Sequence, residues 1–277
     1  MKQAPKETLR HVEAVLSALS LLDCFVTKPV LSVKELIEMT GLTRNRVMRL
    51  CGTLKKKGYL VQDLETKNFS LGYQVMVLGK AFEKSNDLIT TARPILKELV
   101  QNTTESASLY VLEGNKRLVL VREEGTQVIR HSVAEGQRFP IHAGASGKTL
   151  LAFSPEEVTR KLINDRKLVR LTPHTLVDPA VLKVELAKVR SAGYAFSQSE
   201  RTMDAASVAC PVFDHENRLV GAISIGGPVT RFTSDRRPAF VEQVVKAAEK
   251  LSTRLGWKKV NDARKHRMKG ELSAERR

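Results

Sequence analysis

The sequence has 277 residues, 42% of them hydrophobic and 27% charged, which suits two globular domains better than one. It has no run of about 18 apolar residues. Its N-terminus also lacks the apolar core of a secretion signal, so we expect a cytoplasmic protein that does not bind a membrane. The cysteines Cys24, Cys51 and Cys210 are isolated in apolar runs, which is typical of buried thiols and not of a disulfide or zinc set.

The formal charge of +16 is concentrated at the two ends of the chain. Residues 1–80 contain 13 Lys and Arg against 7 Asp and Glu, and residues 258–277 contain 8 against 3. A basic end joined to a nearly balanced body indicates a polyanion-binding module attached to a second domain. Charge alone does not distinguish DNA from RNA or from an anionic membrane. The segment 258–277 has few apolar residues, and we expect a disordered basic tail there.

The first predicted domain, residues 8–72, has the pattern of a winged helix-turn-helix that is otherwise all α-helical. A helix over 8–23 is followed by Ser32 and Glu35, which have the spacing of a capping box at the start of a second helix. Gly41 can take the left-handed conformation that a tight turn before a third helix requires. The inward apolar residues are expected to be Val12, Val15, Leu16, Leu19 and Leu22 on the first helix and Val47, Leu50, Cys51 and Leu54 on the third.

The third helix, for which Thr43 is the expected cap, carries a polar face opposite its apolar stripe. Guanidinium and amide groups on such a face can pair bidentately with guanine and adenine edges in a major groove. Gly52 lies on this face, where glycine costs about 1 kcal/mol relative to alanine. Close approach to a phosphate backbone or to another helix would account for it. The predicted DNA-binding residues are Ser32, Thr43, Arg44, Asn45, Arg46, Arg49, Thr53 and Lys56.

Two short strands, 59–61 and 69–71, can pair around the polar turn 63–68 and form a β-wing. Together with the caps and the turn glycine, they favour a winged helix-turn-helix. The alternative is a solvated basic helix in an ordinary three-helix bundle. We therefore predict double-stranded DNA as a partner.

Residues 73–100 form a predicted helical connector with an apolar stripe, including Val75, Leu78, Ile95 and Leu99. Because a stripe between domains has nothing of its own to pack on, we expect it to mediate dimerisation. Residues 101–257 then form a predicted α+β domain with one antiparallel sheet. Its expected strands are 108–112, 118–122, 128–133, 194–197, 207–213 and 219–225, and its expected helices are 146–153, 155–164, 179–191 and 236–255.

The sharpest motif of this domain is the segment 140–149, PIHAGASGKT. Its end resembles a phosphate-binding loop, but that motif requires a glycine where His142 stands, which argues against nucleotide hydrolysis. A second interpretation is that the small residues open a helix whose first amides, at Ala145, Ser146 and Gly147, bind the carboxylate of a small organic acid. The alternative is that they only let this helix pack closely on the sheet.

No residue set in the sequence predicts catalysis, a metal site or a cofactor. No histidine pair has metal-ligand spacing, and no Ser-His-Asp or Cys-His arrangement can be assembled locally. Of the histidines, His131 and His142 are expected near a pocket. Glu200 and Asp204 lie in a loop segment without a partner that suggests acid-base catalysis.

Over residues 10–256 the chain resembles the IclR family of bacterial transcriptional regulators. The resemblance rests on motifs that occur in order in both domains. They are Phe69-Ser-Leu-Gly72, the connector residues Asp87, Leu88, Ala92 and Pro94, Gly136 with Pro140-Ile-His-Ala143, Gly147-Lys148 and Ala152, Gly193-Tyr-Ala195, Glu200, Ala209-Cys-Pro-Val-Phe-Asp214 and Ala222-Ile-Ser-Ile-Gly-Gly-Pro228.

This resemblance implies a GAF-like C-terminal domain that binds a small organic or aromatic acid. It also implies dimers formed through the N-terminal part, commonly dimers of dimers, and partly palindromic operators. Carried over position by position, the effector-binding residues would be Val128, His131, Ala145, Ser146, Ser197, Ser207, Ser224 and Gly226.

We therefore expect an effector-responsive transcriptional regulator, a repressor or dual regulator of a catabolic operon, and not an enzyme. One alternative is an enzyme acting on a small acid with an accessory nucleic-acid module, which would turn over its substrate. Another is an architectural DNA-binding protein, which would show neither a ligand nor a sequence preference.

Overall fold

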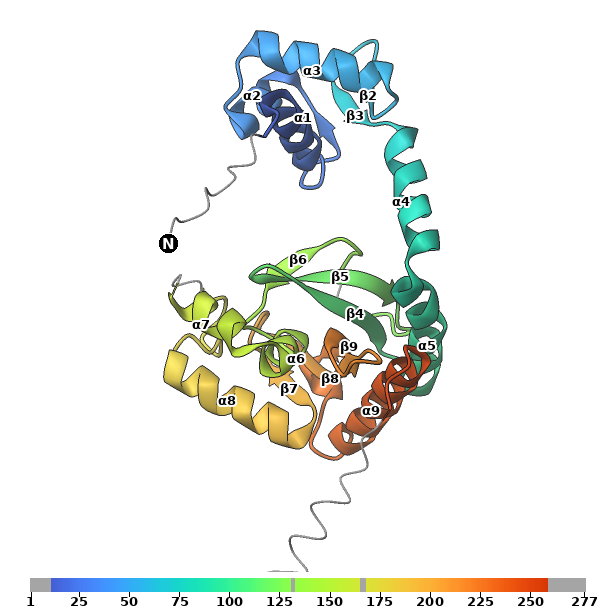
Figure 1. Cartoon of the computed structure of the whole chain (residues 1–277), viewed down its shortest axis with the longest axis vertical. Coiled ribbons are helices and arrows are strands. Elements are labelled where there is room, and N and C mark those ends of the chain that lie inside the picture. Colours follow the sequence, from blue (N-terminus) through green and yellow to red (C-terminus); the bar gives the residue numbers. More distant parts are fainter. Residues whose placement is uncertain (1–10, 131–132, 165–167, 259–277) are drawn as a thin grey trace, which may run out of the picture. The chain divides into compact units, whose positions relative to one another are not determined.

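The computed structural model describes residues 11–130, 133–164 and 168–258, and the chain divides into two compact units, Met1–Asn86 and Asp87–Arg277 (Figure 1). The predicted tail from residue 259 onward and the predicted effector residue at position 131 therefore lie outside the described residues. Within the described ranges, no helix combines the length and the apolar composition needed to cross a membrane.

The first unit is a helix-turn-helix domain with a small antiparallel sheet. The predicted capping box is present, because the Glu35 amide donates to the Ser32 hydroxyl and the Ser32 amide donates to the Glu35 carboxylate at 2.8 Å. Gly41 ends the second helix with φ of 68°, in the left-handed region as predicted. The elements are α1 (Glu13–Cys24), β1 (Val30–Leu31), α2 (Val33–Thr40), α3 (Arg44–Lys56), β2 (Leu60–Gln62), β3 (Phe69–Leu71) and α4 (Tyr73–Ser85).

The wing consists of β2 and β3, which pair antiparallel with Leu60 opposite Leu71. Asp63 shapes its turn, since its Oδ1 accepts hydrogen bonds from the Thr66 amide at 2.7 Å and the Thr66 hydroxyl at 2.8 Å. These bonds lower the pKa of Asp63. A strand that the sequence did not predict, β1, pairs with the other edge of β3, so the wing is part of a three-stranded sheet.

The predicted inward face of the first helix is wrong. α1 buries Ser17, Leu21 and Cys24, and the last two join Phe25 in the core of this unit. The helix is apolar on two faces, so its periodicity is compatible with two orientations, and the core takes the face with fewer large side chains. Most residues expected inward are instead exposed, at 65% for Val12, 54% for Val15, 44% for Leu16 and 54% for Leu19.

The second unit is a six-stranded antiparallel sheet in the order β6-β5-β4-β9-β8-β7, with helices on both faces (Figure 1). The helices α6 and α8 cover one face, and α5 and α9 cover the other, which agrees with the predicted α+β architecture. The elements are α5 (Asp87–Thr103), β4 (Ser106–Glu113), β5 (Lys116–Glu123), β6 (Arg138–Pro140), α6 (Ala145–Phe153), α7 (Glu156–Asn164), α8 (Pro179–Ala192), β7 (Ala195–Gln198), β8 (Ala205–Phe213), β9 (Leu219–Pro228), the 3₁₀ turn η1 (Val229–Arg231) and α9 (Arg237–Arg254).

Half of the apolar stripe predicted for the connector has a partner within the chain. Ile95, Leu96 and Leu99 of α5 are buried against α9 and the sheet. Of the residues of α4, all of which the structure describes, none is buried. The dimerisation hypothesis for the connector therefore rests on α4.

The strand predicted over 128–133 is not formed by its described residues, 128–130 and 133. The chain turns away at the end of β5, because the Gly125 amide donates a hydrogen bond to the Ser106 hydroxyl at 3.0 Å. The short edge strand β6 pairs with β5 instead, and its Pro140 is tolerated because it lies on the edge of the sheet.

Candidate functional site

The helix α3 presents the predicted DNA-binding face to solvent. Arg44, Asn45 and Arg49 are exposed, and among the described residues none of these side chains makes a hydrogen bond or ion pair. Gly52 is exposed as well, and a β-carbon built there would meet no atom of the described residues within 4 Å. Close packing against another described helix of the first unit therefore does not account for Gly52. Close approach of a phosphate backbone remains compatible with it.

Arg46, predicted to contact DNA, is instead directed toward α1. Its Nη2 donates to the Ser17 hydroxyl at 2.8 Å and to the Glu13 carbonyl oxygen at 3.3 Å. The helical periodicity of α3 predicts that Arg46 lies at the edge of the polar face. This edge is where α1 packs against α3. Arg46 thus holds two helices of the domain together.

Of the remaining predicted DNA-binding residues, some have side chains that already form hydrogen bonds within the domain and others do not. The Ser32 hydroxyl takes part in the capping box of α2, and the Thr53 hydroxyl donates to the Arg49 carbonyl oxygen at 3.0 Å. Thr43 stands at the N-cap of α3 but makes no side-chain capping bond, and Lys56 is exposed. Both of these groups are available to a ligand.

An apolar groove runs between α1, α3 and α4 of the first unit. Its walls include Val15 and Leu19 of α1 and Leu78 of α4, which are each about half exposed. Phe82, four residues after Leu78 and so on the same side of α4, is also about half exposed. Exposed apolar patches of this kind on a folded domain usually mark an interaction surface.

The second unit contains a polar cavity of ≈ 60 Å³ between the sheet and the start of α6. Ser197, Ser207, Gly226 and Ser106 lie directly opposite one another on β7, β8, β9 and β4. Because directly opposed residues of antiparallel strands share a face, this row directs three hydroxyls to the cavity. The lining residues are Ser106, Ser108, Tyr110, Arg117, Arg122, Val133, Gly144, Ala145, Ser146, Ser197, Arg201, Ala205, Ala206, Ser207, Ser224 and Gly226.

A β-bulge brings Arg117 and Arg122 of β5 to the same cavity. The register against β4 shifts between Leu109 and Tyr110, which leaves Leu120 as an extra residue in β5. Residues five positions apart in a regular strand point to opposite faces. The bulge reverses this alternation, so both arginines line the cavity.

Glycine is required at two positions around the start of α6. Gly144 has φ of 90°, and a β-carbon there would lie 3.1 Å from Nη2 of Arg117. At Gly147 a β-carbon would overlap both the Ile141 carbonyl oxygen and Nη1 of Arg117. The Arg117 guanidinium packs under this turn and donates to the Ala143 carbonyl oxygen. Close packing is therefore one reason for the small residues of the 140–149 motif.

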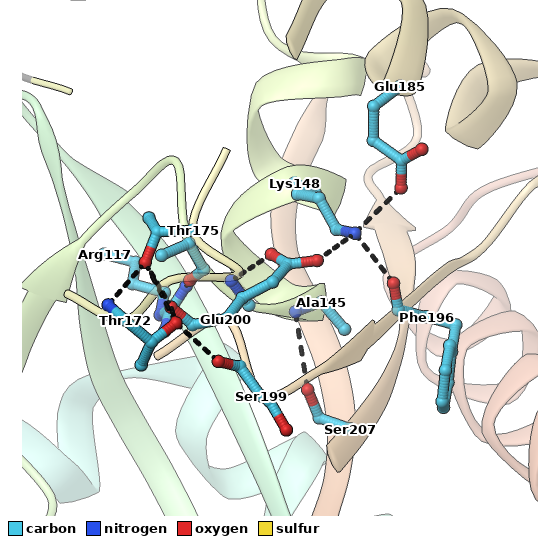
Figure 2. Close-up of polar contacts among 12 residues, drawn as sticks. Arg117, Ala145, Lys148, Thr172, Thr175, Glu185, Phe196, Ser199, Glu200 and Ser207 are labelled. Atoms are coloured by element: carbon cyan, nitrogen blue, oxygen red, sulfur yellow. Dashed lines mark hydrogen bonds and ion pairs between the residues drawn. The ribbon is translucent and has the colours of Figure 1, made fainter. Parts of the chain in front are cut away.

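The chain's own groups occupy part of the anion-binding helix start that the motif predicts. The Gly144 amide donates to the Glu200 carboxylate at 3.0 Å, and the Ala145 amide donates to the Ser207 hydroxyl at 3.4 Å (Figure 2). A carboxylate is favoured at this end of a helix by the unpaired amides and the helix dipole. Glu200, for which the sequence indicated no partner, is thus part of the site.

Lys148 neutralises the charge of the Glu200 carboxylate. Its side chain is 2% exposed, and the ammonium group donates to Glu200 at 2.6 Å, to Glu185 at 2.8 Å and to the Phe196 carbonyl oxygen at 2.8 Å (Figure 2). All three ammonium protons therefore have acceptors. Lys148, which resembles the lysine of a phosphate-binding loop in the sequence, therefore forms a buried ion pair within the domain.

Arg117 is a buried cation without a carboxylate partner among the described residues. It is 3% exposed, and its guanidinium carbon lies 5.5 and 5.6 Å from the ring centroids of Tyr110 and Phe139. Burial lowers the pKa of Arg117 to about 10, helped by the positive charge of Arg201, and the group stays charged at neutral pH. Its Nε has no hydrogen-bond partner. A buried unpaired charge is costly, and an anion in the cavity would offset that cost.

Six of the eight predicted effector residues line this cavity, namely Ala145, Ser146, Ser197, Ser207, Ser224 and Gly226. Val128 does not: it is 93% exposed, beyond the turn at Gly125, which corrects its prediction. His142 is buried outside the lining, with Nε2 2.8 Å from the Val169 carbonyl oxygen, and desolvation lowers its pKa. Among the described residues, no group of His, Cys, Asp and Glu could hold a metal ion.

The arginines of the cavity were missed by the sequence analysis. The one signal they give is a charge at each end of the apolar run 118–121 of β5. Strand alternation assigns these ends to opposite faces, so the bulge at Leu120 had to be known before they could be placed together. Arg201 reaches the cavity from the loop after β7, for which the sequence gives no periodic signal.

Comparison with known proteins identifies the family of both domains. The chain matches the IclR helix-turn-helix domain over residues 14–64 and the bacterial transcriptional regulator IclR C-terminal domain over residues 81–253. It is 32% identical over 245 residues to the HTH-type transcriptional regulator KipR of Bacillus subtilis, covering 88% of this chain and 98% of KipR. It is 30% identical over 249 residues to the transcriptional repressor IclR of Escherichia coli, covering 89% and 91%.

A solved structure shares the fold over most of its length. This is an IclR homolog from Microbacterium hydrocarbonoxydans complexed with 4-hydroxybenzoate, with a TM-score of 0.79 at 24% identity, covering 88% of this chain and 99% of the other. The matched sequence relatives are transcriptional regulators and not enzymes. With its helix-turn-helix domain and its effector-binding domain, the chain belongs to the IclR family of bacterial transcriptional regulators.

Proposed function

We propose that this protein is a homodimeric repressor that binds a palindromic operator through α3 and releases it when a small organic acid occupies the cavity of the second unit. The observation that carries the proposal is the exposed face of α3, on which Arg44, Asn45 and Arg49 have no partner among the described residues. Such groups match base edges in a major groove. The operator of a bacterial regulator is in the cytoplasm, where we place the protein.

The apolar groove of the first unit supports the dimer. The side chains of Val15 and Leu19, which line the groove, are each 54% exposed in the single chain, and that of Leu78 is 49% exposed. A two-fold dimer would cover the same patch on both copies and would present two α3 helices to two half-sites. Palindromic operators follow from that symmetry.

The charge of Arg117 supports an acid as the effector, because a carboxylate in the cavity would pair with this buried guanidinium. The structure of the homolog with 4-hydroxybenzoate supports the same class of ligand, since that molecule is a carboxylic acid. The repressor of Escherichia coli, at 30% identity, supports repression as the output.

The DNA-binding part is tested by an electrophoretic mobility-shift titration with the promoter region beside the gene. Arg49→Ala should weaken operator binding about tenfold or more, since a base contact by arginine is worth about 1–3 kcal/mol. The control is Arg160→Ala, an exposed arginine of α7 in the other unit, which should bind as the wild type does. Unchanged operator affinity of Arg49→Ala would overturn the placement of α3 in the groove.

The effector part is tested by repeating the titration in the presence of organic acids. A repressor of this kind should lose operator affinity when an acid that raises its thermal unfolding temperature is added. An acid that stabilises the protein but tightens operator binding would show an activator or a corepressor mechanism instead. That result would contradict the proposed repressor with an inducing acid.

A further inference from the structure

The walls of the cavity contain a second cation close to Arg117. The lining includes Arg201 and also Arg122, which is paired with Glu124. The Arg201 guanidinium carbon lies 4.4 Å from the ring centroid of Phe139, the ring that Arg117 also contacts at 5.6 Å. Two guanidinium groups therefore share one aromatic ring at the edge of the same small space, an arrangement that like charges oppose.

The carboxylates nearest the cavity are already paired. Glu200 accepts from Lys148 at 2.6 Å and from the Gly144 amide at 3.0 Å. Glu124 accepts from Arg122 at 2.7 Å and from Arg130 at 2.8 Å. Among the described residues, neither forms an ion pair with Arg117. The charge that would balance Arg117 is therefore expected from a ligand.

The surrounding backbone fixes the position of the Arg117 side chain in the cavity wall. The residue is 3% exposed, a β-carbon at either Gly144 or Gly147 would crowd its guanidinium, and its Nε has no partner. Desolvation is also the main cause that lowers the pKa of Arg201, and the charge of Arg122 adds to it. A ligand with two negative charges would relieve repulsion between Arg117 and Arg201, since Arg122 is already paired with Glu124.

The rest of the lining limits the size and polarity of the ligand. Six serines line the cavity, at positions 106, 108, 146, 197, 207 and 224, and Tyr110 is the single aromatic residue among the lining residues. A volume of ≈ 60 Å³ corresponds to roughly four to six water molecules at about 10–15 Å³ each. This space suits a short, oxygen-rich molecule and not an aromatic ring.

We propose that the effector is a dicarboxylate of two to four carbons, with one carboxylate on Arg117, the other toward Arg201, and the serines bonding the remaining oxygens. This inference rests on the proposed effector role of the cavity and names the ligand class. A dicarboxylate matches the separated guanidinium groups better than a single carboxylate does, because each carboxylate can pair bidentately.

The test is isothermal titration of the full-length protein with pairs of acids that differ in one carboxylate. Malonate is paired with propionate, and tartronate with lactate. The dicarboxylate of each pair should bind at least tenfold more tightly. Equal affinity within the pairs, or preferential binding of 4-hydroxybenzoate, would overturn the proposal. Binding of inorganic phosphate without any dicarboxylate would also overturn it, since the dianion would then not be a dicarboxylate.

Two variants make the assignment specific. Arg201→Gln should lower malonate affinity at least tenfold and leave propionate affinity nearly unchanged, whereas Arg170→Gln, an arginine outside the lining, should change neither. Arg117→Met should abolish malonate binding and change the unfolding temperature little, because the removal of an unpaired buried charge offsets the lost bond to the Ala143 carbonyl oxygen. A lower unfolding temperature together with retained malonate binding would show that Arg117 is structural, against the proposal.

Operator binding is measured on the same samples to separate this inference from the proposed function. Specific operator binding with no dicarboxylate binding would overturn the ligand class and leave the regulator intact. Dicarboxylate binding that does not alter operator affinity would support the ligand class and contradict the effector mechanism.

Discussion

Lys148 and Glu200 form an ion pair of 2.6 Å between side chains that are 2% and 9% exposed. The same carboxylate accepts the Gly144 amide at 3.0 Å, so it joins the buried ammonium to the first turn of α6, which lines the cavity. Glu185 of α8 and the Phe196 carbonyl of β7 are bonded to that ammonium too. A change at the helix start is therefore coupled to two other elements through one charged group.

Replacing Lys148 with methionine should strongly destabilise the second unit. The substitution leaves Glu200 and Glu185 without their shared cation, and breaking a buried ion pair by removing one partner costs about 3–5 kcal/mol. Urea unfolding followed by the fluorescence of Trp257, the single tryptophan, reports on this unit because Trp257 stacks on Phe213.

The matched control is Lys188→Met, an exposed lysine on α8, which should change the free energy of unfolding little. The double variant Lys148→Met with Glu200→Gln should recover part of the loss, because the remaining buried group is then neutral. If the single and double variants were equally unstable, the Lys148–Glu200 pair would not be the source of the effect.

The sequence was sufficient for the parts of the fold that local rules determine. The Ser32–Glu35 capping box and the left-handed Gly41 each depend on a few adjacent residues, and both are present. Local sequence rules did not determine which face of α1 packs against the core. Hydrophobicity does not distinguish a stripe that faces the core from a stripe that faces a second protein.

For the cavity, the sequence predicted the serines and missed the cations. Ser197, Ser207 and Ser224 were assigned through family resemblance, and they line the cavity. Arg117 and Arg122 depend on the position of a bulge, which is a property of strand pairing between β4 and β5 and not of either strand alone. The residues that most constrain the ligand were therefore the hardest to predict.

Replacing Gly52 with alanine should separate stability from DNA binding. A β-carbon at this position meets no atom within 4 Å, so the variant should gain up to about 1 kcal/mol from helix propensity. Operator affinity should fall, because the added methyl group occupies the space that a phosphate backbone would use. Thermal unfolding and a mobility-shift titration measure the two effects. A stabilised variant with undiminished operator affinity would show that the backbone does not approach here.

Replacing Arg46 with alanine should loosen α1 and change base recognition little. The substitution removes the bonds to the Ser17 hydroxyl and the Glu13 carbonyl oxygen. The expected loss is at most about 1 kcal/mol, since the side chain is partly exposed. Hydrogen exchange of the α1 amides, read by mass spectrometry, should become faster. Arg44→Ala is the control and should leave this exchange unchanged; equal exchange in both variants would contradict the structural role of Arg46.

His142 should make the second unit less stable as the pH falls. Desolvation holds the pKa of His142 below its usual value, so the unfolded chain binds this proton more readily than the folded chain. The contribution of neutral His142 to the free energy of unfolding is fully present above the pKa of histidine in the unfolded chain, about 6.5. It is lost as the pH falls from there toward the lower folded pKa. Urea unfolding between about pH 7.5 and pH 5.5 should show this loss, and His142→Gln should reduce it. The exposed control His174→Gln should follow the wild type.

Replacing Leu19 with lysine should convert the proposed dimer to a monomer without unfolding it. Leu19 is 54% exposed in the single chain and lines the apolar groove of the first unit, so a charge there is tolerated by the fold but would be buried in the proposed interface. Sedimentation velocity should show the monomer, and affinity for a palindromic operator should fall to that of a half-site. Val181→Lys on α8, a valine that is 51% exposed, is the matched control and should remain dimeric. A Leu19→Lys variant that sediments as a dimer would place the interface away from α1 and α4.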